Sequence, residues 1–160
     1  LTDTEHVAPN PMWAREGEPA GSDGPSTHQR KPRMVQIQKK HQEIQKALYR
    51  LLAGQYGQEN VTWEFPTEIR TQVDLVRKDG EKLIFYEIKT YPSVRVSIRA
   101  ALGQLLEYVH WAQRPETVEM VIVTDLPINA AGKEYIAALR KAYSIPISYS
   151  WFDMNRNQLI

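Results

Sequence analysis

Residues 71–91 read TQVDLVRKDGEKLIFYEIKTY, and this stretch decides the fold because it joins two alternating apolar segments through a turn signal. An Asp-Gly pair between such segments is a strong indication of a β-hairpin. We therefore expect two antiparallel strands with a two-residue turn at Asp79 and Gly80, which places Lys78 opposite Glu81.

The second strand of this hairpin carries two opposite charges in an otherwise apolar segment, LIFYEIKTY. Side chains alternate faces along a strand, so Asp74, Glu87 and Lys89 should share one face. The opposite face should then hold Val73, Leu75, Ile84, Tyr86 and Ile88. The expected register makes Asp74 and Glu87 diagonal neighbours, roughly 7–8 Å apart, and one ion can bridge such a pair.

Two carboxylates and an ammonium on rigid strands are costly to bury unless they are paired or bind a metal. Carboxylate oxygens suit Mg²⁺, which takes one or two of them together with waters and phosphate oxygens. A bound metal acidifies its water, and a nearby lysine helps to orient that water and to stabilise negative charge. The pattern thus predicts half of a metal-dependent hydrolytic site, with an ordinary cross-strand Glu–Lys pair as the alternative.

The rest of the chain predicts a mixed α/β sheet with helices packed on it. We expect helices over 34–57, 93–113 and 129–144, with Asn129 as the cap of the last one, and further strands over 60–68, 118–127 and 145–153. Residues 1–33 are rich in proline and glycine and lack apolar periodicity, so they predict a linker or tail. The domain itself is expected over 34–160, downstream of a further domain that supplies target recognition.

Composition narrows the functional classes. The 160 residues are 42% hydrophobic, contain no cysteine and carry a net charge of +1. The absence of cysteine rules out disulfides and thiolate metal sites and fits a cytoplasmic location. No apolar run approaches the ~20 residues of a membrane span. A near-neutral charge argues against a uniformly basic nucleic-acid coat, so any contact with nucleic acid must come from local patches. Such patches include Lys40, Arg95 and Arg99.

Asp74 followed by EIK at 87–89 resembles the PD-(D/E)xK nuclease superfamily, whose restriction-endonuclease-like core has the element order αβββαβ. The residue before Asp74 is Val73, where many members have proline. The resemblance spans roughly residues 37–152, and nuclease domains of bacterial restriction and defence proteins look similar over 73–111. It implies that Asp74, Glu87 and the carbonyl of Ile88 bind Mg²⁺, or Mn²⁺ in its place, and that Lys89 positions the attacking water.

The segment GQLLEYVHW at 103–111 is similar to the Q-x-x-x-Y motif of the lambda-exonuclease-like branch of this superfamily. Gln104 and Tyr108 are four residues apart and so share a helix face. The resemblance implies that this face adjoins the active site, where Gln104 contacts a phosphate or Lys89. A polar helix face with Tyr108 as an interface anchor is the alternative.

The resemblance also suggests an acidic residue on the first helix, and Glu43 is the candidate to complete the site. Glu64 and Glu68 are weaker candidates for the same role, whereas His41 is expected at the boundary or surface. Arg99 is expected to reach a phosphate from the start of its helix, where the helix dipole favours anions. Arg95 and Lys40 are expected to add further contacts to nucleic acid.

We therefore expect a Mg²⁺-dependent nuclease that cleaves DNA endonucleolytically. The pattern does not distinguish DNA from RNA as the substrate, internal from terminal cleavage, or one metal ion from two. A homodimer would suit double-strand cleavage. One alternative is a catalytically silent nuclease-like domain that binds nucleic acid or a partner protein. The other is an interaction domain in which the charged residues form only a salt-bridge cluster.

Overall fold

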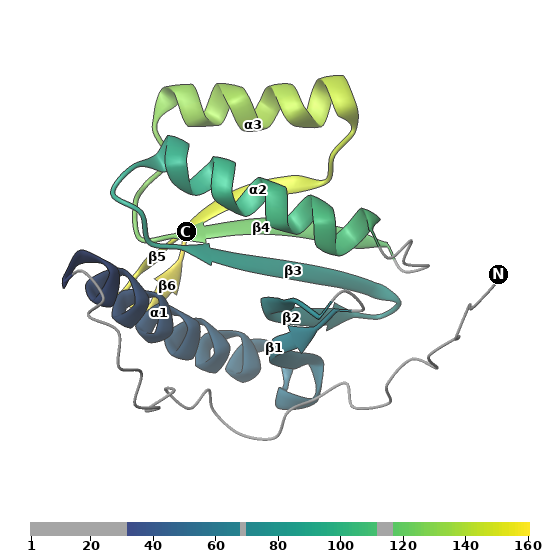
Figure 1. The fold of residues 1–160 in the computed structure, drawn as a ribbon. Coiled ribbons are helices and arrows are strands. Elements are labelled where there is room, and N and C mark those ends of the chain that lie inside the picture. Colours follow the sequence, from purple (N-terminus) through teal and green to yellow (C-terminus); the bar gives the residue numbers. More distant parts are fainter. Residues whose placement is uncertain (1–31, 68–69, 112–116) are drawn as a thin grey trace, which may run out of the picture.

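The structure is a computed structural model that describes residues 32–67, 70–111 and 117–160 (Figure 1). The expected tail over 1–33 lies almost wholly outside these residues, as does Glu68. The elements are α1 (Pro32–Tyr56), the 3₁₀ turn η1 (Gln58–Asn60), β1 (Val61–Pro66), β2 (Gln72–Asp79), β3 (Lys82–Lys89), α2 (Val94–His110), β4 (Val118–Thr124), α3 (Ala130–Tyr143), β5 (Ile147–Asp153) and β6 (Gln158–Leu159).

The six strands form one mixed sheet in the order β1-β2-β3-β4-β5-β6. The first three are antiparallel, β3, β4 and β5 are parallel, and β6 returns antiparallel to β5. The predicted α/β class is confirmed. The two-residue strand β6 was not predicted because such a short segment carries no periodicity.

Helices cover both faces of the sheet (Figure 1). On one face, the apolar stripe of α1, with Ile44, Leu48 and Leu52, packs on Leu75 and Ile88 of the hairpin. On the other face, α2 and α3 pack on residues such as Val76, Phe85 and Met120. None of the described helices is long and apolar enough to cross a membrane.

The hairpin register differs from the predicted one. Asp79 pairs with Lys82, so the turn consists of Gly80 and Glu81 rather than Asp79 and Gly80. Gly80 has φ +61°, a conformation that only glycine adopts without strain. Since glycine fits either central position of a two-residue turn, an Asp-Gly pair locates the turn only to within one residue. Because of this shift, every paired β2 residue lies opposite a β3 residue two positions further along than predicted. A shift of two residues changes the partner of each side chain but not the face on which it lies.

One consequence concerns the two carboxylates. The ladder runs up to the pair Leu75↔Tyr86, and extending its register by one step pairs Asp74 with Glu87. This register makes the two residues direct neighbours across the strands, whereas the sequence predicted diagonal ones. Directly opposed residues have Cβ atoms about 4.5–5.5 Å apart, which brings the carboxylates closer than expected.

β1 and β2 change face at one point. Glu64 has φ +48° and falls between two regular pairs. These pairs are Trp63↔Leu75 and Phe65↔Val73. The first pair packs with α1, but the second packs on the α2 side. Val73 was predicted to share a face with Leu75, and this is wrong because the two side chains pack in different parts of the core. The alternation along β2 therefore breaks at Asp74, which lies between them.

Candidate active site

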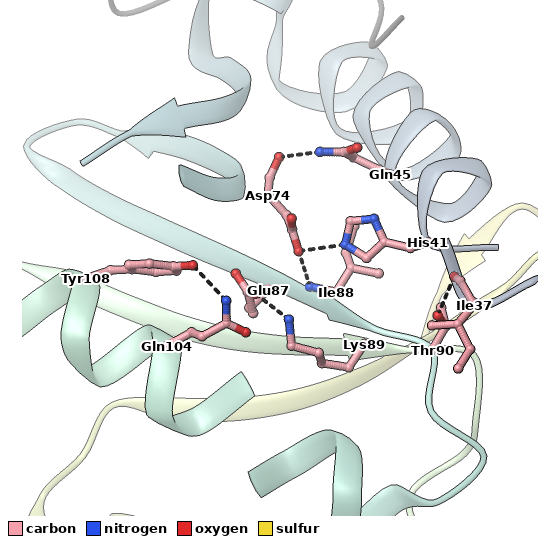
Figure 2. A network of polar contacts seen from close by, with 10 residues as sticks. All are labelled: Ile37, His41, Gln45, Asp74, Glu87, Ile88, Lys89, Thr90, Gln104 and Tyr108. Atoms are coloured by element: carbon pink, nitrogen blue, oxygen red, sulfur yellow. Dashed lines mark hydrogen bonds and ion pairs between the residues drawn. The ribbon is translucent and has the colours of Figure 1, made fainter. Parts of the chain in front are cut away.

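Asp74, Glu87 and Lys89 meet where the β2–β3 hairpin ends (Figure 2). Lys89 Nζ donates a hydrogen bond of 2.6 Å to Glu87 Oε1. Glu87 is only 2% exposed, and its second oxygen, Oε2, is buried without a hydrogen-bond partner in the described part of the chain. A buried carboxylate oxygen with no donor is rare in folded proteins, and it indicates a site that an additional ligand would complete.

Burial and the negative charge of Asp74 raise the pKa of Glu87 to about 8, although Lys89 and His41 act in the opposite direction. One lysine thus compensates only part of the charge that the two carboxylates bring together. A carboxyl group perturbed by burial and by a second carboxylate in a cleft is typical of catalytic and metal-binding sites.

Asp74 is held by α1 and by β3 (Figure 2). Its Oδ2 accepts a hydrogen bond of 2.7 Å from the backbone N–H of Ile88 and lies 3.0 Å from Nε2 of His41. Gln45 Nε2 donates to the backbone carbonyl of Asp74 at 3.0 Å. Burial lowers the pKa of His41, but the hydrogen bond and the charge of Asp74 outweigh this effect and leave it raised. A charged His41 therefore neutralises part of the charge on Asp74.

Two expectations for α1 need correction. Glu43 is exposed and does not line the site, whereas His41, expected at the boundary or surface, contacts Asp74. The reason is helical phase, because Ile44 and Leu48 are fully buried and define the inward face. His41 lies three residues before Ile44, and Gln45 lies one residue after it, so both are near that face. The spacing of His41, Ile44, Gln45 and Leu48 along the helix is a signal in the sequence that could have identified these two polar residues, but it was not used.

The α2 helix brings Gln104 and Tyr108 to the same site. Gln104 Nε2 donates to the Tyr108 hydroxyl at 3.1 Å, so the amide bonds to the tyrosine rather than to Lys89. Burial raises the pKa of Tyr108, as do the negative charges of Glu87 and Asp74. The tyrosine hydroxyl therefore lies within the electrostatic field of both carboxylates.

A cleft of about 460 Å³ opens beside Asp74. Its walls come from α1, α2 and the start of β2, and its lining residues are His41, Gln42, Gln45, Glu64, Arg70, Thr71, Gln72, Asp74, Gln104 and Tyr108. Glu64, a weaker candidate for the acidic role, thus borders the cleft. Arg70, Thr71 and Gln72 were not predicted, because nothing in a short polar connection between strands marks it as part of a site.

The three basic residues proposed for nucleic-acid contact lie outside this lining. Lys40 forms an ion pair with Asp125 at the end of β4. Arg95 and Arg99 are exposed on the outer face of α2. If they contact nucleic acid, they do so outside the cleft.

The carboxylates fit a hard divalent cation in part. Among the described residues, no group of three or more histidine, aspartate or glutamate side chains is arranged to hold a metal ion. Asp74 and the buried oxygen of Glu87 supply two carboxylates, and Mg²⁺ commonly binds one or two with waters and phosphate oxygens in its other positions. The site therefore suits Mg²⁺ better than a metal that needs a full set of protein ligands.

Comparisons of the chain with protein-family models, with curated proteins and with solved structures find no match.

Proposed function

We propose that this chain is a metal-dependent nuclease domain of the PD-(D/E)xK type, which hydrolyses phosphodiester bonds in DNA. The observation that carries the proposal is the buried Oε2 of Glu87, which has no hydrogen-bond partner among the described residues. Glu87 bonds to Lys89 through its other oxygen and lies within the field of the Asp74 carboxylate. In an ordinary Glu–Lys pair the two charges compensate each other, whereas here the carboxylate of Asp74 adds a further negative charge. The order of the first elements, one helix, three strands, a helix and a strand, also agrees with the restriction-endonuclease-like core.

In this proposal Asp74 and Glu87 hold Mg²⁺, with the carbonyl of Ile88 as a further ligand. The ion would acidify a water molecule and stabilise charge on the scissile phosphate. His41 and the N–H of Ile88 fix one oxygen of Asp74, which limits the rotation of its carboxylate. A ligand held in this way loses less conformational entropy on binding.

Lys89 is the catalytic residue in this mechanism. Its ammonium lies 2.6 Å from Glu87 Oε1, beside the carboxylate pair. From there it orients the water that attacks phosphorus and stabilises the charge that develops on the phosphate oxygens. The reaction forms one bond between the water oxygen and phosphorus and breaks one ester bond, while the water loses a proton and the leaving alkoxide gains one. Gln104 and Tyr108 line the cleft beside Asp74 and are placed to contact the substrate.

The test is cleavage of plasmid DNA by the purified domain with Mg²⁺, with Mn²⁺ and with a chelator. We expect metal-dependent nicking that falls at least 100-fold in Lys89→Ala. Lys141→Ala is the matched control, since Lys141 is exposed on α3. Full activity in a folded Lys89→Ala variant would refute the role of Lys89. A parallel reaction with single-stranded RNA tests the choice of DNA.

A silent nuclease-like domain is the second candidate, and one observation favours it. Each carboxylate already has a cationic partner within the chain, Lys89 for Glu87 and His41 for Asp74. Such pairs can replace a metal in a site that has lost its chemistry. Binding of DNA without cleavage by any divalent metal, together with no calorimetric signal for Mg²⁺ or Mn²⁺, would favour this candidate.

A further inference from the structure

The connection between β1 and β2 forms one wall of the cleft. Arg70, Thr71 and Gln72 all line it, next to Asp74 at the start of β2. Because β2 carries Asp74 as its third residue, this connection is covalently close to the carboxylates. A strand of nucleic acid bound in the cleft would therefore lie beside these residues.

Threonines on either side of Arg70 hold this wall in place. Thr67 donates its backbone N–H to the carbonyl of Thr71 at 2.8 Å, and the two hydroxyls lie 2.6 Å apart. The Thr71 N–H donates to the Thr67 hydroxyl at 3.2 Å. Thr67 is buried. These bonds join Thr67 to Thr71 and fix the backbone at Thr71, directly after Arg70.

Arg70 is held in a conformation that non-glycine residues seldom adopt. Its φ is +62°, and its backbone N–H donates to the carbonyl of Thr67 at 3.2 Å. Such a conformation is strained and persists where the surroundings impose it, often at functional sites. The backbone here therefore sets the direction in which the Arg70 side chain leaves the chain.

The guanidinium of Arg70 remains available. Arg70 is exposed, and it forms no ion pair or side-chain hydrogen bond with the described residues. The other basic side chain in the cleft, His41, is committed to Asp74. Arg70 is therefore the basic side chain of the lining that a polyanion in the cleft can meet.

We propose that Arg70 binds a phosphate of the substrate strand adjacent to the phosphate that is cleaved. This inference rests on the proposed nuclease function and adds the class of substrate, a strand with at least one phosphodiester beyond the scissile one. Guanidinium binds phosphate through two parallel hydrogen bonds, which fix direction as well as position. Arg70 is thus a positioning residue that sets which bond of the strand lies over Asp74 and Glu87.

The test compares Arg70→Ala on two substrates, a fluorescent 12-nucleotide DNA and a single diester, bis(p-nitrophenyl) phosphate. We expect KM for the oligonucleotide to rise about tenfold with kcat little changed, as for the loss of one charge-assisted contact. Hydrolysis of the single diester should stay unchanged, because it has no flanking phosphate. Equal losses on both substrates, or no loss on either, would overturn the proposal.

Two control variants accompany Arg70→Ala. Alanine keeps the Cβ of arginine, so the positive φ costs the same in Arg70→Ala and folding should be unaffected. Arg140→Ala removes an exposed arginine of α3, outside the cleft, and should leave both substrates unchanged. Arg70→Lys keeps the charge but not the paired donors, and it should recover only part of the affinity.

A binding experiment separates this inference from the proposed function. Affinity for the same oligonucleotide is measured by fluorescence anisotropy in chelator, at several salt concentrations. Loss of one phosphate contact should reduce the slope of log K against log[salt] by about 0.7 for a single strand. If wild type cleaves no DNA but Arg70→Ala still has a smaller slope than wild type, the nuclease function is refuted and the phosphate contact is supported. If wild type cleaves DNA and Arg70→Ala has the same slope as wild type, only the phosphate contact is refuted.

Discussion

At the scale of single residues, the decisive feature is a carboxylate that folding leaves under-compensated. Glu87 is nearly fully buried, bonds to Lys89 through one oxygen, and has no partner for the other among the described residues. Burying a charged carboxylate costs several kcal/mol unless it is fully paired. The fold therefore retains a local cost at the point where the proposed chemistry needs a free ligand.

This cost predicts a pH dependence of stability in chelator. The pKa of Glu87 is about 8 in the folded chain, above its ordinary value of 4.5. Between these values the folded state binds more protons than the unfolded state, so stability falls as pH rises from about 4.5 to about 8. We expect Glu87→Gln to remove this fall and to gain on the order of 4 kcal/mol over wild type at pH 9 relative to pH 5.

Urea titrations of both proteins at pH 5, 7 and 9 measure this difference. Exposed Glu134 provides the matched control Glu134→Gln, which should show the same pH dependence as wild type. If wild type and Glu87→Gln lose stability in parallel with rising pH, the buried carboxylate is not the origin of the effect.

At the scale of elements, α1 places two polar side chains on the site through its helical phase. His41 bonds to Asp74, and Gln45 bonds to the backbone of the same residue. The β1–β2 pair contributes the break at Glu64, where the strands change face. Each element thus presents its polar residues at one point while the rest of its length packs in the core.

The face of α1 predicts opposite outcomes for two neighbouring substitutions. His41→Gln removes the positive charge beside Asp74, and we expect cleavage to fall about tenfold through a less fixed carboxylate. Glu43→Gln, two residues along on the exposed side, should leave cleavage within about twofold of wild type. Rates with saturating Mg²⁺ measure both variants. A larger loss in Glu43→Gln than in His41→Gln would contradict the assignment.

At the scale of the whole molecule, helices from both faces of the sheet meet at the hairpin end. Residues of α1, β2, β3 and α2 line or border the same site (Figure 2). Thr90, which follows β3, also donates to the carbonyl of Ile37 at 2.9 Å and ties the first helix to the end of that strand. The site is therefore assembled only when both layers have packed.

This arrangement predicts that Mg²⁺ stabilises the entire fold. A ligand that binds only the folded state adds RT ln(1 + [L]/Kd), or about 2.7 kcal/mol at 100 times Kd. We expect Mg²⁺ to raise the Tm of wild type and to leave that of Asp74→Ala unchanged. Scanning calorimetry with 0 and 10 mM Mg²⁺ compares the two, with Asp79→Ala as a control in the hairpin. Equal shifts in all three proteins would indicate nonspecific binding.

Local patterns in the amino-acid sequence are enough to predict the α/β class, the order of the helices and longer strands, and the face that Glu87 and Lys89 share. These features follow from local periodicity and from turn and cap signals, as at Asn129, whose side chain accepts a hydrogen bond from the Gly132 N–H at 2.8 Å. They depend on residues close together in the chain, so the sequence alone carries them.

Only the tertiary structure decided the register of the hairpin, the change of face at Glu64, the place of His41 instead of Glu43, and the inclusion of Arg70 in the cleft. A turn signal allows two registers, and a helix carries polar residues at every angle around its axis. Packing between distant segments selects among these choices. The site depends on that selection, because its residues come from four elements that meet only in the folded chain.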